Sequence, residues 1–230
     1  MPAMISLIAF LGNYGREYER TRHNVAWQFA SSLPFYDRLS WQEKFKGDVA
    51  VLETERFASL LAETGLLTTK EGGIPPLPKA APEKLYFLKP LTYMNLSGEA
   101  IGELARFYKI PPEEVLVVHD ELELPFGTVS LKWAGGLGGH NGLRSTKATL
   151  GTADFWRLRF GLTKPVGRDI ADYVLSAFTA EEAASLPLVF GQAAGLFARL
   201  LLSSDPARLI PEWGKKKVLA PVAGGKEASR

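Results

Sequence analysis

Short apolar runs alternate with helical patterns along all 230 residues of the chain. Continuous apolar runs of four to eight residues predict strands that are buried on both faces of a sheet. Residues 44–63 are predicted to form two strands around a turn. The other predicted strands are residues 4–11, 84–90, 114–121, 128–133 and 156–162.

The segments between these runs repeat their apolar positions with helical spacing. In residues 95–109, for example, Ile101, Leu104, Ala105 and Tyr108 fall on one face. Further helices are predicted for residues 23–33, 141–151, 169–178 and 180–204. Gly151 is expected to close the third of these five helices, and Pro187 to interrupt the last near its start.

Because strands and helices interleave from end to end, the pattern predicts one three-layer α/β domain over residues 1–210, with a mixed, mostly parallel twisted sheet. Residues 68–83 are rich in proline and glycine and are predicted to form an excursion loop. Residues 211–230 have little apolar content and many basic residues, so they are predicted to form a flexible tail.

The composition is that of a soluble globular protein, with 46% apolar and 23% charged residues. No apolar run looks long enough to span a bilayer, and the apolar start lacks a basic segment, so it is interpreted as a strand rather than a signal peptide. The chain has no cysteine. Disulfides, thiolate nucleophiles and cysteine zinc sites are therefore excluded, and a cytoplasmic location is expected.

The net charge of +2 is unevenly distributed. Residues 132–168 contain seven basic residues and one acid, a net charge of +6, and residues 214–230 contain five and one, a net charge of +4. A basic stretch on a nearly neutral protein suggests an anionic partner on one face. A solvated charged surface explains the same charges, so both interpretations stay open.

Polar residues gather where the predicted strands end. Asn13 follows the first strand, and His119 and Asp120 end the central one. Because functional sites in α/β sheets collect at the carboxyl ends of strands, four loops can bring one set of side chains together. That set is Asn13, His23, Asn95, Asp120 and Asn141.

A histidine with a carboxylate partner can act as a general base, and side-chain amides can bind carbonyl groups or a developing oxyanion. The chain has neither a cysteine nor a G-x-S-x-G segment, so an activated water is the expected nucleophile. The set therefore points to hydrolysis of an ester or an amide. Several of these residues also have a structural alternative: His23 suits a helix start, Asn95, Asp120 and Asn141 suit caps or turns, and the neighbouring His119 suits the core.

The segment AGGLGGHNG, residues 134–142, leads into a helix N-terminus that would favour a phosphate or a carboxylate. It matches neither a Walker loop nor a dinucleotide fingerprint, and a mobile connection or lid is the plain alternative. Arg144 and Lys147 extend the basic surface that begins at Lys132. No set of metal ligands with a recognised spacing accompanies these residues.

Five segments together resemble one family, the bacterial-type peptidyl-tRNA hydrolases, which release peptides from prematurely dissociated peptidyl-tRNA. The segments are residues 12–24, 92–98, 117–127, 135–143 and 155–162. The resemblance implies a monomeric protein with an α/β/α sandwich fold and neither a metal nor an organic cofactor. Its expected partner is peptidyl-tRNA, and no membrane is expected to bind it. Tyr14, Ala134 and Leu137 depart from the family pattern.

The resemblance also implies residue roles. His23 matches the general base that activates water, Asp120 the carboxylate that orients it, and Asn13 the amide that distinguishes blocked from free aminoacyl ends. The remaining matches are Tyr18, Tyr93, Asn95 and Asn141 at the substrate terminus, Met94 and His140 beside the cleft, and Lys132 and Arg159 on tRNA phosphate. A non-catalytic RNA-binding module on the same fold, and a nucleotide-binding enzyme using the glycine loop, are the competing hypotheses.

Overall fold

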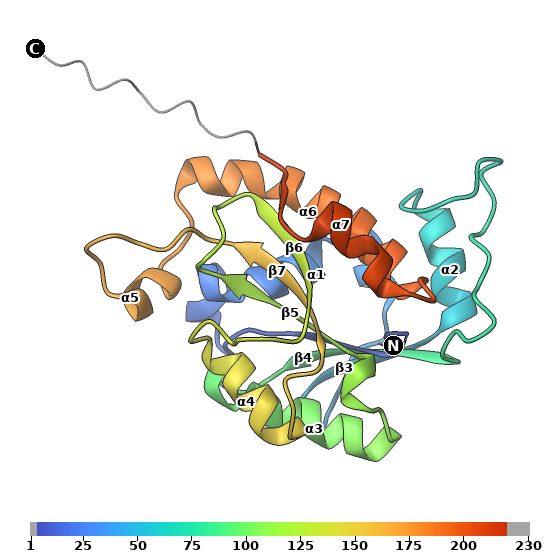
Figure 1. Cartoon of the computed structure of the whole chain (residues 1–230), viewed down its shortest axis with the longest axis horizontal. Coiled ribbons are helices and arrows are strands. Elements are labelled where there is room, and N and C mark those ends of the chain that lie inside the picture. Colours follow the sequence, from blue (N-terminus) through green and yellow to red (C-terminus); the bar gives the residue numbers. More distant parts are fainter. Residues whose placement is uncertain (1–3, 220–230) are drawn as a thin grey trace, which may run out of the picture.

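The computed structural model describes residues 4–219, which form one mixed sheet covered by helices on both faces (Figure 1). The eight strands lie in the order β2-β3-β4-β1-β5-β7-β6-β8. Their bounds are β1 Leu7–Phe10, β2 Gln42–Lys44, β3 Gly47–Glu53, β4 Lys84–Pro90, β5 Val115–Glu121, β6 Thr128–Trp133, β7 Trp156–Gly161 and β8 Lys216–Lys217.

The helices form the two outer layers of the predicted α/β/α sandwich. Helices α1, α2, α6 and α7 pack on one face of the sheet, and α3 and α4 on the other (Figure 1). The bounds are α1 Val25–Ser32, α2 Thr54–Glu63, α3 Ser97–Tyr108, α4 Asn141–Leu150, α5 Ile170–Val174, α6 Ala180–Leu201 and α7 Ile210–Trp213. The short helix α5 stands apart at the end of the sheet where β5 and β7 finish.

Parallel pairing is confined to the centre of the sheet. Strands β4, β1, β5 and β7 run parallel, whereas β2, β3, β6 and β8 pair antiparallel at the two flanks. The mixed sheet is therefore confirmed, but "mostly parallel" describes its centre and not its flanks. The carboxyl ends of the four central strands open at one edge, as a site of the predicted kind requires.

Strand β5 shows why its sequence is almost continuously apolar. Leu116 and Val118 face the core beneath α1 and α6, and Val115 and Val117 face the core beneath α3. All four side chains are buried. A strand covered on both faces has no solvent-facing position until it ends, so the polar residues His119 and Asp120 stand at its carboxyl end.

The prediction for residues 44–63 was right in its first part and wrong in its second. Strands β2 and β3 form a hairpin around Phe45 and Lys46, but residues 54–63 form helix α2. Phe57, Leu60 and Leu61 recur with helical spacing and are buried against the sheet. That period outweighs the strand propensity of the neighbouring segment.

Two helical predictions need correction. Helix α6 continues through Pro187, since Leu186, Val189 and Phe190 on both sides of it are held in the core. By length and composition α6 is also apolar enough to cross a bilayer, contrary to expectation, but 56% of its most apolar window is buried inside the domain. The predicted helix over residues 169–178 is confined to α5, because the chain then turns to bridge Thr21 at Ala177.

The first part of the predicted tail is folded. Residues 211–219 pack against the domain: Trp213 is buried, and β8 pairs with β6 at Val129. The rest of the predicted tail, residues 220–230, lies outside the described residues. The loop between α2 and β4 contains no helix or strand over residues 68–83.

The α3–α4 contact provides a test of the packing. A Cβ at Gly98 would lie 2.2 Å from the backbone oxygen of Ser145, so Gly98→Ala is expected to lower the free energy of unfolding by about 2 kcal/mol or more. A Cβ at Gly191 in α6 meets nothing within 4 Å, so Gly191→Ala should leave the free energy of unfolding unchanged or raise it by up to about 1 kcal/mol. Urea unfolding of both variants checks this; equal effects would contradict the close packing at Gly98.

Candidate active site

A cleft of about 600 Å³ opens at the carboxyl edge of the parallel strands. Its walls come from the loops after β1, β4 and β5, from the glycine loop before α4, and from α5. Among the residues that line it are Asn13, His23, Met94, Asn95, Asp120, His140 and Asn141. The fold therefore brings together the five residues predicted to meet there, together with Met94 and His140.

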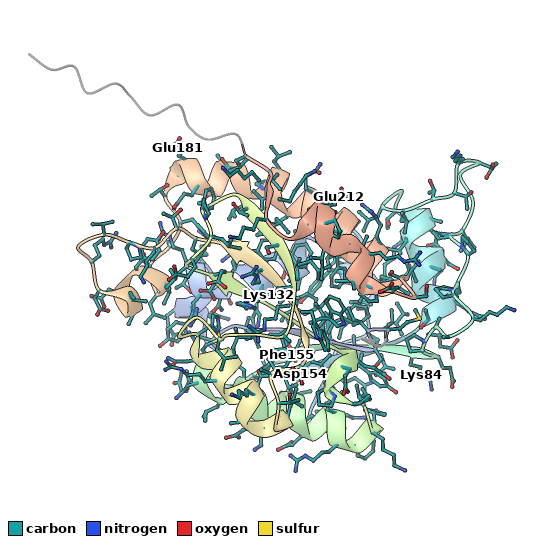
Figure 2. All side chains as sticks on the ribbon, in the orientation of Figure 1. Lys84, Lys132, Asp154, Phe155, Glu181 and Glu212 are labelled. Carbon is teal, nitrogen blue, oxygen red and sulfur yellow. The ribbon has the colours of Figure 1, made fainter. Side chains whose placement is uncertain are left out.

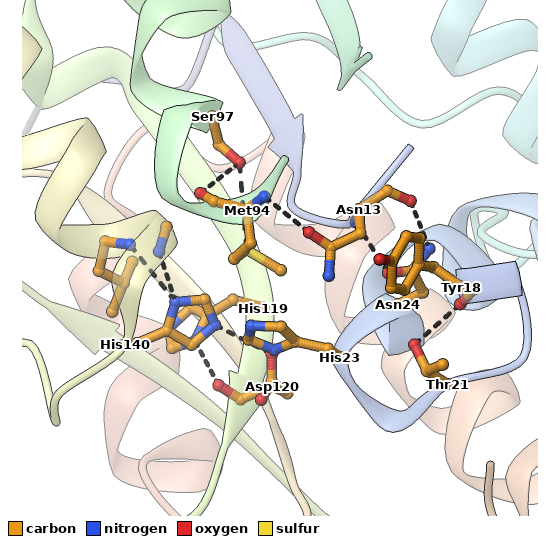
Figure 3. Close-up of polar contacts among 12 residues, drawn as sticks. Asn13, Tyr18, Thr21, His23, Asn24, Met94, Ser97, His119, Asp120 and His140 are labelled. Atoms are coloured by element: carbon orange, nitrogen blue, oxygen red, sulfur yellow. Dashed lines mark hydrogen bonds and ion pairs between the residues drawn. The ribbon is translucent and has the colours of Figure 1, made fainter. Parts of the chain in front are cut away.

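The centre of the site is the contact between His23 and Asp120 (Figure 3). Asp120 ends β5 and is 2% exposed, and its Oδ1 lies 2.8 Å from Nδ1 of His23. His23 comes from a short 3₁₀ turn, Arg22–Asn24, that leads into α1. With Nδ1–H donating to the carboxylate, Nε2 of His23 is the nitrogen left as a proton acceptor. It has no hydrogen-bond partner among residues 4–219.

His140 makes a second hydrogen bond to the same oxygen. Its Nε2 lies 2.9 Å from Oδ1 of Asp120, while its Nδ1 accepts hydrogen bonds from the backbone N–H groups of Gly142 and Leu143. Because Nδ1 is an acceptor, the proton is on Nε2, and this tautomer donates to Asp120. His140 is thus the N-cap of α4, the role that the sequence suggested for Asn141. The Asn141 side chain is exposed at the cleft.

The two imidazoles determine the charge state of the site. Burial by itself would raise the pKa of Asp120, but His23 and His140 outweigh it and hold that pKa far below its usual range. Burial would lower the pKa of His23, and the charge and hydrogen bond of Asp120 outweigh it and raise that pKa. The carboxylate is therefore ionised, and the imidazole beside it is a stronger base than usual.

His119 is structural, as its alternation with Asp120 predicted. It is 1% exposed, its Nδ1 lies 2.6 Å from the backbone oxygen of Asp120, and its ring packs on that of His140. Burial, followed by the nearby His140, lowers the pKa of His119 well below its usual value. It therefore remains neutral beside the site.

Hydrogen bonds hold both the backbone and the side chain of Asn13 in place. Its backbone N–H donates to Oδ1 of Asn24 and its backbone oxygen accepts from Nδ2 of Asn24, at 2.8 and 2.9 Å. Its own Oδ1 accepts from the backbone N–H of Met94 at 2.7 Å. The amide nitrogen is consequently turned toward the histidines (Figure 3) and is free to donate. Sequence reasoning missed Asn24, because nothing in the sequence marks it apart from its place after His23.

Tyr18 and Tyr93 lie beside the cleft rather than in its lining. Their rings meet edge to face, with centroids 6.4 Å apart, and Tyr93 is 59% exposed. Tyr93 directly precedes Met94, which does line the cleft. The pair thus forms an exposed aromatic edge next to Asn13.

Lys132 and Arg159 also lie outside the cleft lining, on β6 and β7. Arg159 is buried, and its guanidinium contacts Oε2 of Glu121 at 3.2 Å and Oγ of Ser130 at 2.7 Å. Glu121 does line the cleft, so it connects the two regions. Burial, with the charges of nearby arginines, lowers the pKa of Lys132.

A buried arginine that sequence reasoning overlooked holds the loop of His23 in place. Arg22 donates to Oγ of Ser176 at 2.7 Å, to the backbone oxygen of Ala177 and to Glu182 at 2.6 Å. Its guanidinium also lies over the ring of Tyr173, 4.5 Å from the centroid. These contacts tie the turn of His23 to the segment between α5 and α6, which carries one wall of the cleft.

His23, Asp120 and His140 also offer metal-ligand atoms within 4.8 Å of one another. A cation there would have to replace both hydrogen bonds to Asp120, and the second nitrogen of His140 is already used by the helix N-terminus. The geometry of the three side chains is fully explained by hydrogen bonding between them.

A buried carboxylate that orients an imidazole, in an open cleft lined with amides, is typical of enzymes that use general-base catalysis. The α/β/α sandwich and the site at the carboxyl edge of its parallel strands therefore place the protein in the class of α/β enzymes that use general-base catalysis.

Comparison with known proteins narrows the class. The family model described as peptidyl-tRNA hydrolase matches residues 7–218. Peptidyl-tRNA hydrolase of Treponema pallidum (strain Nichols) is 44% identical over 220 residues, covering 94% of this chain and 98% of that protein. The protein of that name from Desulfitobacterium hafniense (strain Y51) is 45% identical over 179 residues, 77% of this chain and 83% of that protein.

Solved structures agree with the sequence comparison. A mutant of peptidyl-tRNA hydrolase from Acinetobacter baumannii matches with a TM-score of 0.75 at 28% identity, covering 95% of this chain and 99% of that one. A complex of peptidyl-tRNA hydrolase with N-propanol matches with a TM-score of 0.72 at 28% identity, covering 91% and 94%. The chain belongs to the peptidyl-tRNA hydrolase family.

The role of Arg22 can be tested through stability. Arg22→Met leaves Glu182, the Ser176 hydroxyl and the Ala177 backbone oxygen without their donor in a largely buried environment, so the free energy of unfolding should fall by about 3 kcal/mol. Arg20→Met removes an equal charge from an exposed position two residues away and should change it by less than about 0.5 kcal/mol. Denaturant unfolding measures both, and a loss below about 1 kcal/mol for Arg22→Met would contradict the anchoring role.

Proposed function

We propose that this protein hydrolyses the ester bond between a peptide and the 3′-terminal ribose of tRNA, which frees the tRNA for reuse. The observation that carries the proposal is the His23–Asp120 pair, which leaves Nε2 of His23 as a base at an amide-lined cleft in a chain of this family. A water is the nucleophile, since the chain has no cysteine and no serine or threonine among residues 4–219 lines the cleft.

In the proposed reaction, Nε2 of His23 takes a proton from a water as the water oxygen attacks the ester carbonyl carbon. The bond from that carbon to the ribose oxygen then breaks, and the protonated imidazole returns its proton to the leaving ribose oxygen. Asp120 stabilises the imidazolium that forms between these steps and keeps the ring in the required tautomer. His140 donates a second hydrogen bond to the same carboxylate oxygen.

The amides provide the neutral part of the site. The free Nδ2 of Asn13 and the side chains of Asn95 and Asn141 can donate to substrate carbonyls or to the developing oxyanion without adding charge. A peptide carbonyl is present in a blocked aminoacyl end and absent from a free one, so these donors favour the blocked form. Met94 shapes the cleft, and Tyr18 and Tyr93 offer faces to the substrate's terminal base or peptide.

Lys132 and Arg159 are proposed to hold a tRNA phosphate next to the cleft. Glu121, which lines the cleft and contacts Arg159, lies between the two regions. A phosphate there would compete with Glu121 for the guanidinium of Arg159. We further propose that the enzyme acts as a cytoplasmic monomer with no cofactor.

The proposal predicts cleavage of N-blocked aminoacyl-tRNA and little or no cleavage of the unblocked form. His23→Ala should lower kcat by about 100- to 10,000-fold and leave tRNA affinity within about twofold, because the base is lost and the phosphate contacts remain. Turnover and tRNA-binding assays measure the two effects. Equal cleavage of both substrates would refute the proposal, and tight RNA binding without hydrolysis would favour a non-catalytic RNA-binding module instead.

The pH profile tests the pairing of His23 with Asp120. Hydrolysis requires neutral His23, so kcat/KM should fall as the pH drops through the raised pKa of that imidazole. Asp120→Asn removes the charge that raises this pKa and leaves the burial that lowers it. The acidic limb should therefore move to lower pH, while kcat falls by about 100-fold or more because the tautomer is no longer held. If the acidic limb of the pH profile did not move in this variant, the limb would belong to a group other than His23.

A further inference from the structure

Five cationic side chains gather on one face of the sheet where β7, β6 and β8 meet. In the antiparallel register Lys132 lies opposite Arg157, Ser130 opposite Arg159, and Thr128 opposite Lys217. Residues directly opposite one another share a face, and alternate residues along a strand do so too. The register thus places four of the cations on one face. Lys215 follows Gly214, whose backbone oxygen accepts a hydrogen bond from Ser130 on that face. The set, termed here the basic face, is Lys132, Arg157, Arg159, Lys215 and Lys217.

The intervening residues point to the opposite face, into the core beneath α6. These are Val129, Leu131, Leu158 and Phe160, all of which are buried. Lys216 shares their side, and its Nζ lies 5.6 Å from the ring centre of Trp213. The alternation of β6, β7 and β8 therefore separates an apolar core from a face that carries the cations. Arg157 and Arg159 are buried on that face, so its accessible charge comes from the lysines.

The segment that carries Lys215 and Lys217 is tied to the predicted phosphate contact. Oγ of Ser130 donates to the backbone oxygen of Gly214 and accepts from the guanidinium of Arg159 at 2.7 Å. Trp213 is buried directly before this point, and Val218 donates to the backbone oxygen of Gly127 at 2.9 Å after it. The two lysines thus stand on backbone anchored at both ends.

Little negative charge offsets the basic face. Glu121 contacts Arg159, but Lys132, Lys215 and Lys217 have no carboxylate within 4.0 Å among residues 4–219. Lys215 and Lys217 are exposed, and Lys132, which Figure 2 labels near the middle of the view, is half-buried. Burial is the main cause of the lowered pKa of Lys132, and the charges of Arg159 and Arg157 add to it.

A continuous path leads from the cleft to this surface. Glu121 lines the cleft and contacts Arg159, Arg159 contacts Ser130, and Ser130 contacts Gly214, the residue before Lys215. We propose that Lys215 and Lys217 bind the phosphate backbone of the substrate's RNA beyond Lys132, so that β8 lengthens the RNA-binding surface away from the ester. This inference rests on the proposed function.

Phosphate backbone fits the chemistry of the two lysines better than a base edge or a peptide. Exposed ammonium groups are point charges on flexible stems, which suit phosphates of any sequence and carry no base specificity. Contacts of this kind release counterions and depend steeply on salt. The lysines should accordingly contribute to affinity for RNA and not to the chemical step.

The experiment compares Lys215→Gln/Lys217→Gln with Lys44→Gln/Lys70→Gln. The control pair removes the same charge from exposed positions on β2, at the opposite edge of the sheet, and in the loop after α2. For N-blocked aminoacyl-tRNA the first variant should raise KM about tenfold with kcat unchanged, and its log–log salt slope for binding deacylated tRNA should fall by about 1 to 2. An N-blocked aminoacyl-CCA trinucleotide, which has no stem, should be cleaved equally by the variant, the control and the unaltered protein.

The outcomes separate the two proposals. Turnover by the unaltered protein with no difference between variant and control, in KM and in salt slope, would overturn the role of β8 and leave the proposed function intact. An equal loss on the trinucleotide would overturn it too, since the effect would then reach the catalytic cleft. Binding of vesicles of anionic phospholipid with the same lysine dependence, and no effect on tRNA, would assign the face to a membrane. No turnover of either substrate by the unaltered protein would remove both proposals together.

Discussion

The arrangement of the site depends on one buried carboxylate. Asp120 ends the central strand, where it is almost completely shielded from water, and an isolated charge there would be costly. Two imidazoles compensate for it, His23 from the turn before α1 and His140 from the cap of α4. A single ionised oxygen thereby joins three segments that are far apart in the chain. The same contacts orient the base and leave its second nitrogen free.

The parallel centre and the antiparallel flank of the sheet carry different parts of the proposed site. The parallel centre places β1, β4 and β5 with their carboxyl ends together. The loops after β1 and β4 supply Asn13 and Met94, and the end of β5 supplies Asp120. The antiparallel flank of β7, β6 and β8 presents cations on one face and core residues on the other. Glu121 and Arg159 connect the two regions, so the proposed chemistry and the proposed RNA contact share one edge.

Much of the fold was predictable because local periodicity and burial agree. The apolar run of β5 and the helical spacing of α3 both have the structure that their patterns predict. The prediction failed for residues 54–63, where a helical period was taken for a strand, and at Pro187, where core packing on both sides keeps α6 continuous. It also failed for residues 211–219, because a two-residue strand and a buried tryptophan in a polar segment give almost no periodic pattern.

By itself the sequence determined the layers, the order of most elements and a set of polar residues at strand ends, since these follow from hydrophobic spacing and from the types of residue available. Motif resemblance pointed to the family that the comparisons then showed. Only the tertiary structure decided which nitrogen of each histidine faces Asp120, that His140 rather than Asn141 caps α4, and that Asn24 and Arg22 hold the segment around His23. Those features depend on contacts between residues up to 160 positions apart, whose distances and orientations arise only when the sheet has brought their loops together.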